Sequence, residues 1–152
     1  MAEQQTQGPQ DDEEVLDSPR GWVASHVRRY VETGGEDGQV RYGAQNLLIT
    51  TRGRRSGKLR RTALVYGRDG DRYVLVASNG GAPKHPLWYL NLVADPLVEL
   101  QVGAERFDAR ARTATAEEKP RLWELMVSIL PQYAGYQAKA GRDIPVVVVE
   151  RA

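Results

Sequence analysis

Two strand-like runs that flank a short, strongly basic turn constrain the fold more than any other feature of this chain. The runs 46–51 and 62–66 are rich in apolar and β-branched residues, and the segment 52–61 around the turn holds six Arg or Lys residues. Two such runs joined by a turn predict an antiparallel hairpin. Burial cannot explain so many cations in one turn, so the turn is either solvated or binds a polyanion.

Four more strand-like runs follow, and turn signals place them mostly beside their sequence neighbours. Asp69-Gly70-Asp71 is a hairpin signal before the run 72–78, and Gly103-Ala104 joins the runs 98–102 and 106–113. The run 144–149 is the last. The sequence therefore predicts an α+β fold, a mostly antiparallel six-stranded closed or split β-barrel with peripheral helices.

Helical patterns outside these runs predict the peripheral helices. Pro86 suits the first position of a helix over 86–93, Thr115 and Glu118 have capping-box spacing before a helix that ends at Leu130, and an amphipathic segment over 132–140 follows. The first helix begins at Pro19 and ends at Gly34-Gly35, and its apolar stripe consists of Trp22, Val23, Val27, Tyr30 and Val31.

The charge of the chain is divided unevenly between its first residues and the rest. The net charge is +1, but residues 1–17 carry six acids and no base, so the other 135 residues hold 21 bases against 14 acids. We expect a disordered acidic tail over 1–16 and one basic split-barrel domain over 17–152. A basic domain suits an anionic ligand or an anionic surface.

Several kinds of site are excluded by composition and spacing. The chain has no cysteine, which excludes disulfides, thiolate metal sites and a cysteine nucleophile. Its two histidines lack a second ligand at metal spacing, and Ser78 does not stand in a G-x-S-x-G nucleophile motif. An enzyme built on this sequence would rely on a cofactor for its chemistry. No apolar run approaches the length of a membrane span, so a cytoplasmic protein is expected. The helix from Pro19 either packs on the barrel or, through exposed Trp22 and Tyr30, contacts a membrane surface.

Four segments are candidates for binding, and each also has a plain structural reading. The basic turn is not a Walker A loop, because Leu59 replaces the Ser or Thr that would hold magnesium. It also lacks the interleaved aromatics of a nucleic-acid site, which leaves that partner as the weaker alternative. The other candidates are the turn 77–81 with its backbone N–H groups, the pair Trp88 and Asn91 on one helix face, and the pair Tyr133 and Tyr136, which forms either packing or a lid over a planar ligand.

These motifs together resemble the deazaflavin-dependent nitroreductase family. The resemblance covers 47–58, 68–70, 76–81, 86–92, 94–96, Tyr133-x-x-Tyr136 and 144–146. It implies a split β-barrel of the flavin-reductase or FMN-binding type, and coenzyme F420, a deazaflavin, as the hydride donor. The polyanionic phosphate–glutamate tail of that cofactor would match the cationic turn.

The resemblance also implies residue roles. Ser78, Tyr133 and Tyr136 would act on the substrate, with Ser78 polarising the ring or the substrate oxygen. The basic turn would bind the tail of the cofactor, and the end of the strand 72–78 would line its ring. The helix 86–93 would line the tail side of the cofactor site. The implied cofactor-binding residues are Gly53, Arg54, Arg55, Ser56, Gly57, Lys58, Arg60, Val76, Ala77, Ser78, Asn79, Leu87, Trp88, Asn91 and Tyr136, and no metal is expected.

The sequence departs from the enzyme that names that family mainly at the substrate face. Val65 and Leu130 stand where that enzyme has tyrosines, Asn79 where it has lysine, and Ala63 where proline is usual. We therefore expect hydride transfer from reduced F420 to a quinone, an enone or a nitro-type acceptor, with reduction of bulky nitroimidazoles in doubt. The alternatives are a non-catalytic barrel that binds the deazaflavin or FMN, and a nucleic-acid-binding module. The oligomeric state is left open.

Overall fold

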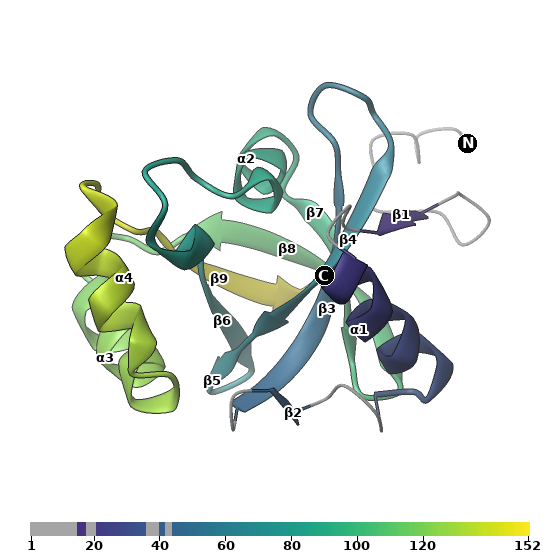
Figure 1. Ribbon diagram of the computed structural model, residues 1–152, viewed down its shortest axis with the longest axis horizontal. Coiled ribbons are helices and arrows are strands. Elements are labelled where there is room, and N and C mark those ends of the chain that lie inside the picture. The colour runs from purple at the N-terminus through teal and green to yellow at the C-terminus, as the bar shows by residue number, and fades with distance from the viewer. Residues whose placement is uncertain (1–14, 18–20, 36–39, 42–43) are drawn as a thin grey trace.

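The computed structural model describes residues 15–17, 21–35, 40–41 and 44–152 (Figure 1). Its helices are α1 (Gly21–Glu32), α2 (Leu87–Ala94), α3 (Lys119–Ile129) and α4 (Gln132–Ala140), with a short 3₁₀ helix η2 (Asn79–Gly81). Its strands are β1 (Val15–Asp17), β2 (Val40–Arg41), β3 (Ala44–Arg52), β4 (Leu59–Val65), β5 (Gly67–Asp69), β6 (Arg72–Val76), β7 (Leu97–Val102), β8 (Glu105–Thr113) and β9 (Val146–Arg151).

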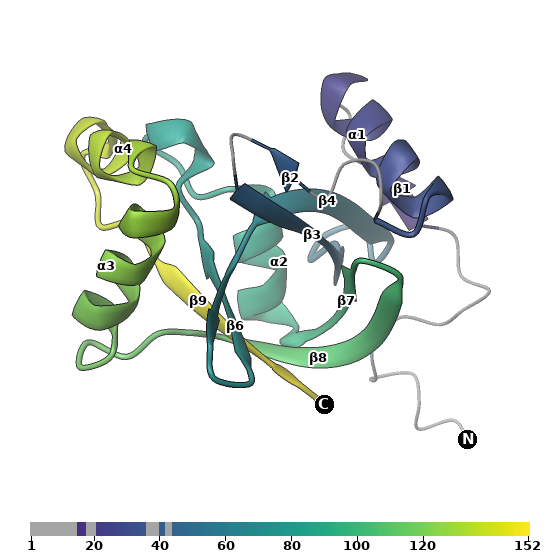
Figure 2. The ribbon, with the colours of Figure 1, turned by 90° about the horizontal axis from the view of Figure 1, so that it is seen from below.

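The strands form one sheet in the order β1-β4-β3-β7-β8-β9-β6-β5, and β2 pairs with β3 beside this path. Every pairing is antiparallel except the parallel pairing of β1 with β4. The sheet curls around itself, as the two perpendicular views show (Figures 1 and 2). No ladder between described residues joins its two ends, so the sheet is a curled, open barrel.

The α+β fold with a mostly antiparallel sheet is confirmed, and so are all six expected strands. They correspond to β3, β4, β6, β7, β8 and β9. The expected count of six was too low, because β1, β2 and β5 have only three, two and three residues, too short for a periodic pattern. β1 includes two residues of the expected disordered tail 1–16, and residues 1–14 lie outside the described residues.

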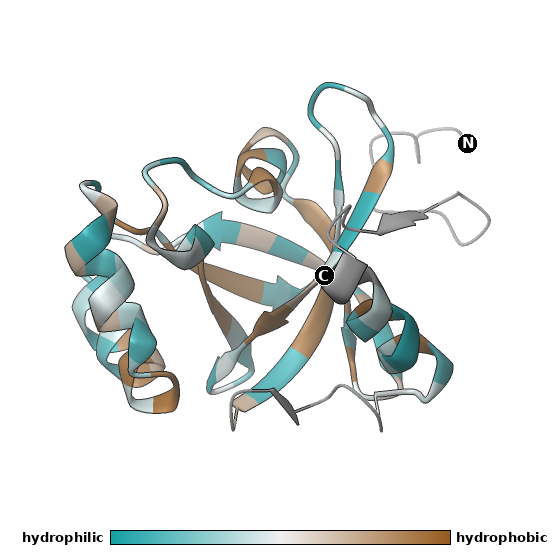
Figure 3. Ribbon diagram, viewed as in Figure 1, coloured by the Kyte–Doolittle hydropathy of each residue, from teal (hydrophilic) through white to brown (hydrophobic). Residues whose placement is uncertain are grey.

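Two hydrophobic clusters lie on opposite faces of β6 and β9. Leu75 and Val147 point into the curled sheet with residues such as Leu47 and Leu100, whereas the alternate residues face α3 and α4. Side chains alternate in this way along any strand, and burial on both faces explains the continuous apolar run of β9. Figure 3 shows β6 and β9 in hydrophobic colours over most of their length.

Helix α1 packs on β3 and β4, and its Tyr30 is a core residue. The Tyr30 hydroxyl donates to the Asn46 carbonyl at 3.0 Å and accepts from the Gly103 amide at 2.8 Å. Tyr30 is fully buried, so its expected exposure as a membrane anchor was wrong, whereas Val31 of the expected apolar stripe is 38% exposed. The side chains of Trp22 and Val23 lie outside the described part. Across the described chain, no helix has the length and hydropathy needed to span a membrane.

The start of α3 is fixed by the expected capping box and by ion pairs. The Thr115 amide donates to Glu118 Oε1 at 2.9 Å, and the Glu118 amide donates to Thr115 Oγ1 at 3.2 Å. Glu118 also pairs with Arg112, and Asp69 pairs with Arg72 and Arg121. Hydrogen bonds from these arginines hold the pKa of both carboxyl groups at about 2. The network joins α3 to the β5–β6 hairpin and to β8.

Candidate functional site

The basic turn is a tight connection at the tip of the β3–β4 hairpin. The ladder continues to Arg52 opposite Leu59, after which the Gly53 amide donates to the Lys58 carbonyl at 2.7 Å and the Gly57 amide to the Gly53 carbonyl at 2.8 Å. A Cβ on Gly53 would lie 2.6 Å from Ser56 Oγ, and Gly57 has a φ of +71°. The left-handed backbone at Gly57 therefore favours glycine, whereas a side chain at position 53 would require the Ser56 hydroxyl to move.

The turn presents positive charge that the described protein does not neutralise. Arg54, Arg55, Lys58 and Arg60 are exposed, and none of the four forms an ion pair with a described residue. Ser56 Oγ accepts from the Lys58 amide at 3.2 Å, which orders the turn from within. Three of these cations stand on the ordered turn and Arg60 stands in β4, and such a cluster suits an anion with several charges.

Asn91 fastens this turn to helix α2. Its Oδ1 accepts from the Arg54 amide and its Nδ2 donates to Thr51 Oγ1, both at 3.1 Å, and the residue is 6% exposed. The polar groups of the Asn91 side chain are thus engaged by the protein itself. Within this structure Asn91 positions the basic turn, and any contact with a ligand would be additional.

Helix α2 lies between the basic turn and the loop that follows β6 (Figure 1). Trp88 packs partly buried against the cluster inside the sheet and meets Tyr89 edge-on, with ring centroids 6.4 Å apart. Leu87 is 72% exposed. The packing interpretation of Trp88 therefore holds, and its indole is only in part available to a ligand.

In the loop after β6, several hydrogen-bond donors have no partner among the described residues. Ser78 is buried, and neither its hydroxyl nor the amides of Ser78 and Asn79 donate to any described residue. The chain then passes through three left-handed residues, with φ of 50° at Asn79, 64° at Gly80 and 83° at Gly81. Unsatisfied donors at a buried strand end suit the polar edge of a ligand that covers them.

The tyrosine pair packs on this same loop. A Cβ on Gly81 would lie 3.1 Å from the Cα and from the carbonyl oxygen of Tyr136, so helix α4 touches the loop backbone. Tyr133 is 5% exposed, meets Tyr136 at 6.2 Å and Trp123 at 6.4 Å between ring centroids, and its pKa is raised by burial. Neither tyrosine hydroxyl bonds a described residue. The two tyrosine rings are therefore packed against their neighbours, while both hydroxyl groups are without a hydrogen-bond partner among the described residues.

Arg142, which the sequence reasoning did not single out, binds the loop to the chain after α4. Its guanidinium donates to the carbonyls of Ser78, Ala82 and Lys84, each at 3.1 Å. Its Nη1 also lies 3.1 Å from His85 Nδ1. Because guanidinium only donates, this histidine nitrogen must accept, and burial together with the Arg142 charge lowers the His85 pKa. The only sequence signal was a cation just after Gly141, which is weak.

Gln137 holds Arg142 in place from helix α4. Its Nε2 donates to the Arg142 carbonyl at 2.6 Å, and its Oε1 accepts from the Ile144 amide at 2.9 Å. Helix α4, Arg142 and the loop after β6 therefore form one hydrogen-bonded unit. The structure brings together the residues predicted for the ring and substrate, and separately the basic turn with Asn91, with α2 between the two groups.

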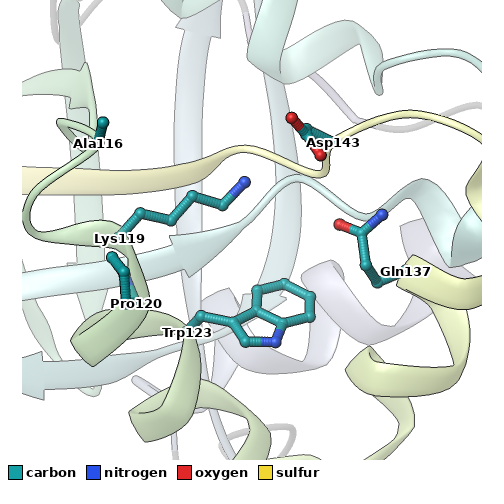
Figure 4. A pocket seen from close by; sticks show the side chains of 6 residues that line it. All are labelled: Ala116, Lys119, Pro120, Trp123, Gln137 and Asp143. Atoms are coloured by element: carbon teal, nitrogen blue, oxygen red, sulfur yellow. The ribbon is translucent and has the colours of Figure 1, made fainter.

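A hollow of about 470 Å³ lies elsewhere, between α3, α4 and the segment before β9 (Figure 4). Figure 4 shows the Trp123 indole as one wall. It includes no predicted site residue, and no group of acidic or histidine side chains in the described chain could hold a metal ion. The lining residues are Ala116, Lys119, Pro120, Trp123, Gln137 and Asp143.

Several known proteins are similar in sequence to this chain over most of its length. An F420H(2)-dependent quinone reductase of Mycobacterium tuberculosis is 41% identical over 130 residues, which cover 83% of this chain and 87% of the relative. A solved F420-H2 dependent reductase is 44% identical with a TM-score of 0.64, covering 69% of this chain and 93% of that chain. A solved structure described as a domain-swapped dimer is 41% identical with a TM-score of 0.67, covering 88% and 100%.

The family model named F420H(2)-dependent quinone reductase matches residues 22–151. The dependence on reduced F420 that the resemblance implied is therefore confirmed, while the family carries the name quinone reductase and not nitroreductase. An α+β curled sheet is shared with the solved reductase. Since the match spans nearly all of the described domain, the chain belongs to the F420H(2)-dependent quinone reductase family.

Proposed function

We propose that the protein uses F420H2 to reduce a quinone-type acceptor, with the cofactor tail on the basic turn and the ring beside the loop after β6. When bound, reduced F420 supplies a hydride as an electron pair. The observation that supports this proposal best is a group of four exposed cations, three on the turn and Arg60 in β4, that form no ion pair with a described residue, in a chain of the F420H(2)-dependent quinone reductase family.

The basic turn fits the tail of the cofactor by charge and by rigidity. The tail is a phosphodiester followed by glutamates, and Arg55 and Lys58 can each give it charge-assisted hydrogen bonds. Asn91 and the two glycines hold the turn before any ligand arrives, which lowers the entropy lost on binding. Arg54, Ser56 and Arg60 complete the proposed cradle.

The loop after β6 fits the edge of a flat ring. Val76, Ala77 and Ser78 are buried at the strand end, where a ring can lie on the backbone. The amides of Ser78 and Asn79, which donate to no described residue, can donate to ring carbonyls, and the Ser78 hydroxyl can donate to the ring or to an acceptor oxygen. Trp88 and the exposed Leu87 would cover the middle of the cofactor from α2.

The acceptor is proposed to lie between the ring and helix α4. The hydroxyls of Tyr133 and Tyr136, which bond no described residue, would donate to a quinone oxygen as it gains negative charge. Val65 and Leu130 make this face more apolar than the tyrosines of the nitroreductase that names the related family. A flat quinone or enone suits such a face, and a bulky nitroimidazole suits it less.

Two measurements test this proposal. Purified protein should oxidise F420H2 in the presence of a soluble quinone, and should do so more slowly with an enone or a nitroimidazole. The double variant Arg55→Ala, Lys58→Ala should weaken F420 binding about a hundredfold or more at low salt, because each charge-assisted contact contributes roughly 1.5–3 kcal/mol. The deficit should shrink in high salt.

The matched control removes two exposed arginines from other elements, Arg28→Ala in α1 and Arg110→Ala in β8. This variant changes the net charge equally and should bind F420 as the wild type does. Equal losses in both double variants would remove the cradle assignment. Tight binding of F420 without turnover would favour the non-catalytic barrel, preference for FMN would favour a flavin protein, and steep salt-dependent binding of DNA would favour the nucleic-acid module.

A further inference from the structure

We propose that the hollow of about 470 Å³ between α3, α4 and the segment before β9 binds a flat aromatic acid, and that the bound acid stabilises the loop after β6. The acid would carry its carboxylate at one end of the ring system and a hydrogen-bond donor at the other end. This inference does not rest on the proposed function, because the hollow includes none of the residues assigned to the cofactor or to the acceptor.

The size and the walls of the hollow suit a small aromatic molecule. Small-molecule sites in proteins enclose roughly 300–1,000 Å³, and the hollow lies within that range. Its apolar walls are Ala116, Pro120 and the partly buried indole of Trp123. An aromatic ring packs favourably against another ring, either offset and stacked or edge to face. The middle of the ligand is therefore expected to be flat and apolar.

Two opposite charges lie at this hollow without a partner in the described part of the chain. Figure 4 shows the Lys119 amine and the Asp143 carboxylate directed toward the space beside Trp123. Neither group forms an ion pair with a described residue, so the two are too far apart to pair with each other. Because an ammonium donates and a carboxylate accepts, a ligand between them needs an anionic acceptor at one end and a donor at the other.

Lys119 stands at a position where a lysine lowers the stability of its own helix. It is the first residue of α3, and the first turn of this helix contains no acidic residue. The N-terminus of a helix carries a partial positive charge, which repels a cation and attracts an anion. Residues that oppose their local structure are expected at functional sites. A carboxylate bound by Lys119 would remove this conflict.

The hollow borders the hydrogen bonds that support the loop after β6. Gln137 lines the hollow, and its Nε2 donates to the Arg142 carbonyl at 2.6 Å. Asp143 follows directly, and the Arg142 guanidinium donates to the carbonyls of Ser78 and Ala82, each at 3.1 Å. A ligand that is held by Asp143 and packs against Gln137 would restrain the segment that carries Arg142. The loop would then open less often, without any change of its average structure.

The first experiment titrates the protein, without cofactor, with 6-hydroxy-2-naphthoate and follows the amide and indole N–H signals by NMR. The signals of residues 141–144 and of the Trp123 indole, assigned through Trp123→Phe, should shift with a dissociation constant of about 0.1–1 mM, as expected for a ligand of this size. 2-Naphthol lacks the carboxylate and 2-naphthoate lacks the hydroxyl, so each should bind about three- to thirtyfold more weakly. Absence of saturable shifts at these residues would overturn the proposal.

Two lysine variants with the same change of charge locate the carboxylate. Lys119→Met should weaken binding of 6-hydroxy-2-naphthoate about three- to thirtyfold but leave binding of 2-naphthol unchanged. Lys139→Met is the matched control, because Lys139 lies at the loop after β6, where a Cβ on Gly81 would lie 3.3 Å from its Cδ. It should bind the probe as the wild type does. A loss in Lys139→Met alone would place the probe at that loop, and equal losses in both variants would show a general field effect; either result would overturn the proposal.

An aspartate variant tests the other end of the ligand. Asp143→Ala should bind 6-hydroxy-2-naphthoate no better than 2-naphthoate, because the hydroxyl of the probe loses its acceptor. A hydroxyl that still strengthens binding in Asp143→Ala would overturn the proposed orientation.

Amide hydrogen exchange tests the stabilisation of the loop. With the hollow saturated, the peptide 77–85 should exchange about fivefold more slowly, at the low end of the coupling measured between protein sites. In Arg142→Met the probe should still bind but should no longer slow this exchange. Unchanged exchange in the wild type at saturation would overturn the stabilisation. Neither experiment uses F420, so failure of this inference and failure of the proposed function would be told apart.

Discussion

Replacing Arg142 should loosen the loop after β6 and weaken cofactor binding, although Arg142 is proposed to touch neither cofactor nor substrate. The guanidinium makes two partly buried bonds of 3.1 Å, to the carbonyls of Ser78 and Ala82, besides its contacts with Lys84 and His85. At the low end for a charged donor, about 1.5 kcal/mol each, the two partly buried bonds contribute about 3 kcal/mol.

For a protein of this size, each 1 kcal/mol shifts Tm by roughly 2–4 °C, so Arg142→Met should lower Tm by about 6–12 °C. Arg142→Lys should fall between, since one ammonium cannot reproduce the planar fork of a guanidinium. Thermal unfolding followed by circular dichroism gives Tm, and amide hydrogen exchange of the peptide 77–85 reports the loop directly. In both variants the loop should exchange faster and F420 should bind more weakly.

His85 provides the matched control for this prediction. Its Nδ1 accepts from Arg142, and its ring lies 4.9 Å from that of Tyr89. Because the folded-state pKa of His85 is lowered, this contact is present at neutral pH and is lost as the pH falls below that pKa. His85→Asn keeps an acceptor without a titrating group, so its loop should stay protected at acid pH. A Tm within 2 °C of the wild type in Arg142→Met, with unchanged exchange, would refute the reasoning.

Three further predictions concern the turn, the lid and the start of α3. Asn91→Ala should raise the F420 dissociation constant and lower Tm, because the Arg54 amide loses its partner, whereas Gln101→Ala in β7 should lower Tm alone. Tyr136→Phe should lower kcat with a quinone by about ten- to a thousandfold with little change in F420 affinity. If Tyr136→Phe keeps full activity and only Tyr136→Ala loses stability, Tyr136 serves packing and not catalysis. The pKa values of about 2 at Asp69 and Glu118 predict stability that is complete above about pH 4.5 and lost toward pH 2, so Tm measured against pH should change less steeply in Asp69→Asn, Glu118→Gln.

The strands and helices were predictable because periodicity and turn chemistry are local. The hairpin at Gly70, the capping box of Thr115 with Glu118, and α4 over 132–140 were all expected and are present. The short strand β1 was not predictable, because its pairing with β4 is a contact between distant segments and Val15-Leu16-Asp17 has no period to detect. Burial of Tyr30 depends in the same way on Asn46 and Gly103, far along the chain.

In the candidate site, too, the local motifs were predictable from the sequence and the contacts between distant segments were not. Cations and glycines of the basic turn are neighbours in sequence, so the turn was visible as a motif. The tethering of Asn91 to Arg54 and the contacts of Arg142 with Ser78 join residues 37 and 64 positions apart. Arg142 carries no distinctive local pattern, and a single sequence does not reveal which carbonyls a guanidinium will reach. The roles of Ser78, Tyr133 and Tyr136 remain predictions.

Helices α3 and α4 form an excursion between two strands that are direct neighbours in the sheet. β8 pairs with β9 from Ala109 opposite Arg151 to Thr113 opposite Val147, so the sheet is continuous here without either helix. The proposed tail cradle and ring support come from the continuous stretch 53–91, while the tyrosines come from the excursion alone. The excursion, residues 114–145, would then carry most of the proposed acceptor face, and it also carries Arg142, whose bonds to Ser78 and Ala82 support the loop proposed for the ring. Transplanting residues 114–145 between relatives, with Arg142 kept, would test whether this excursion sets the preferred acceptor.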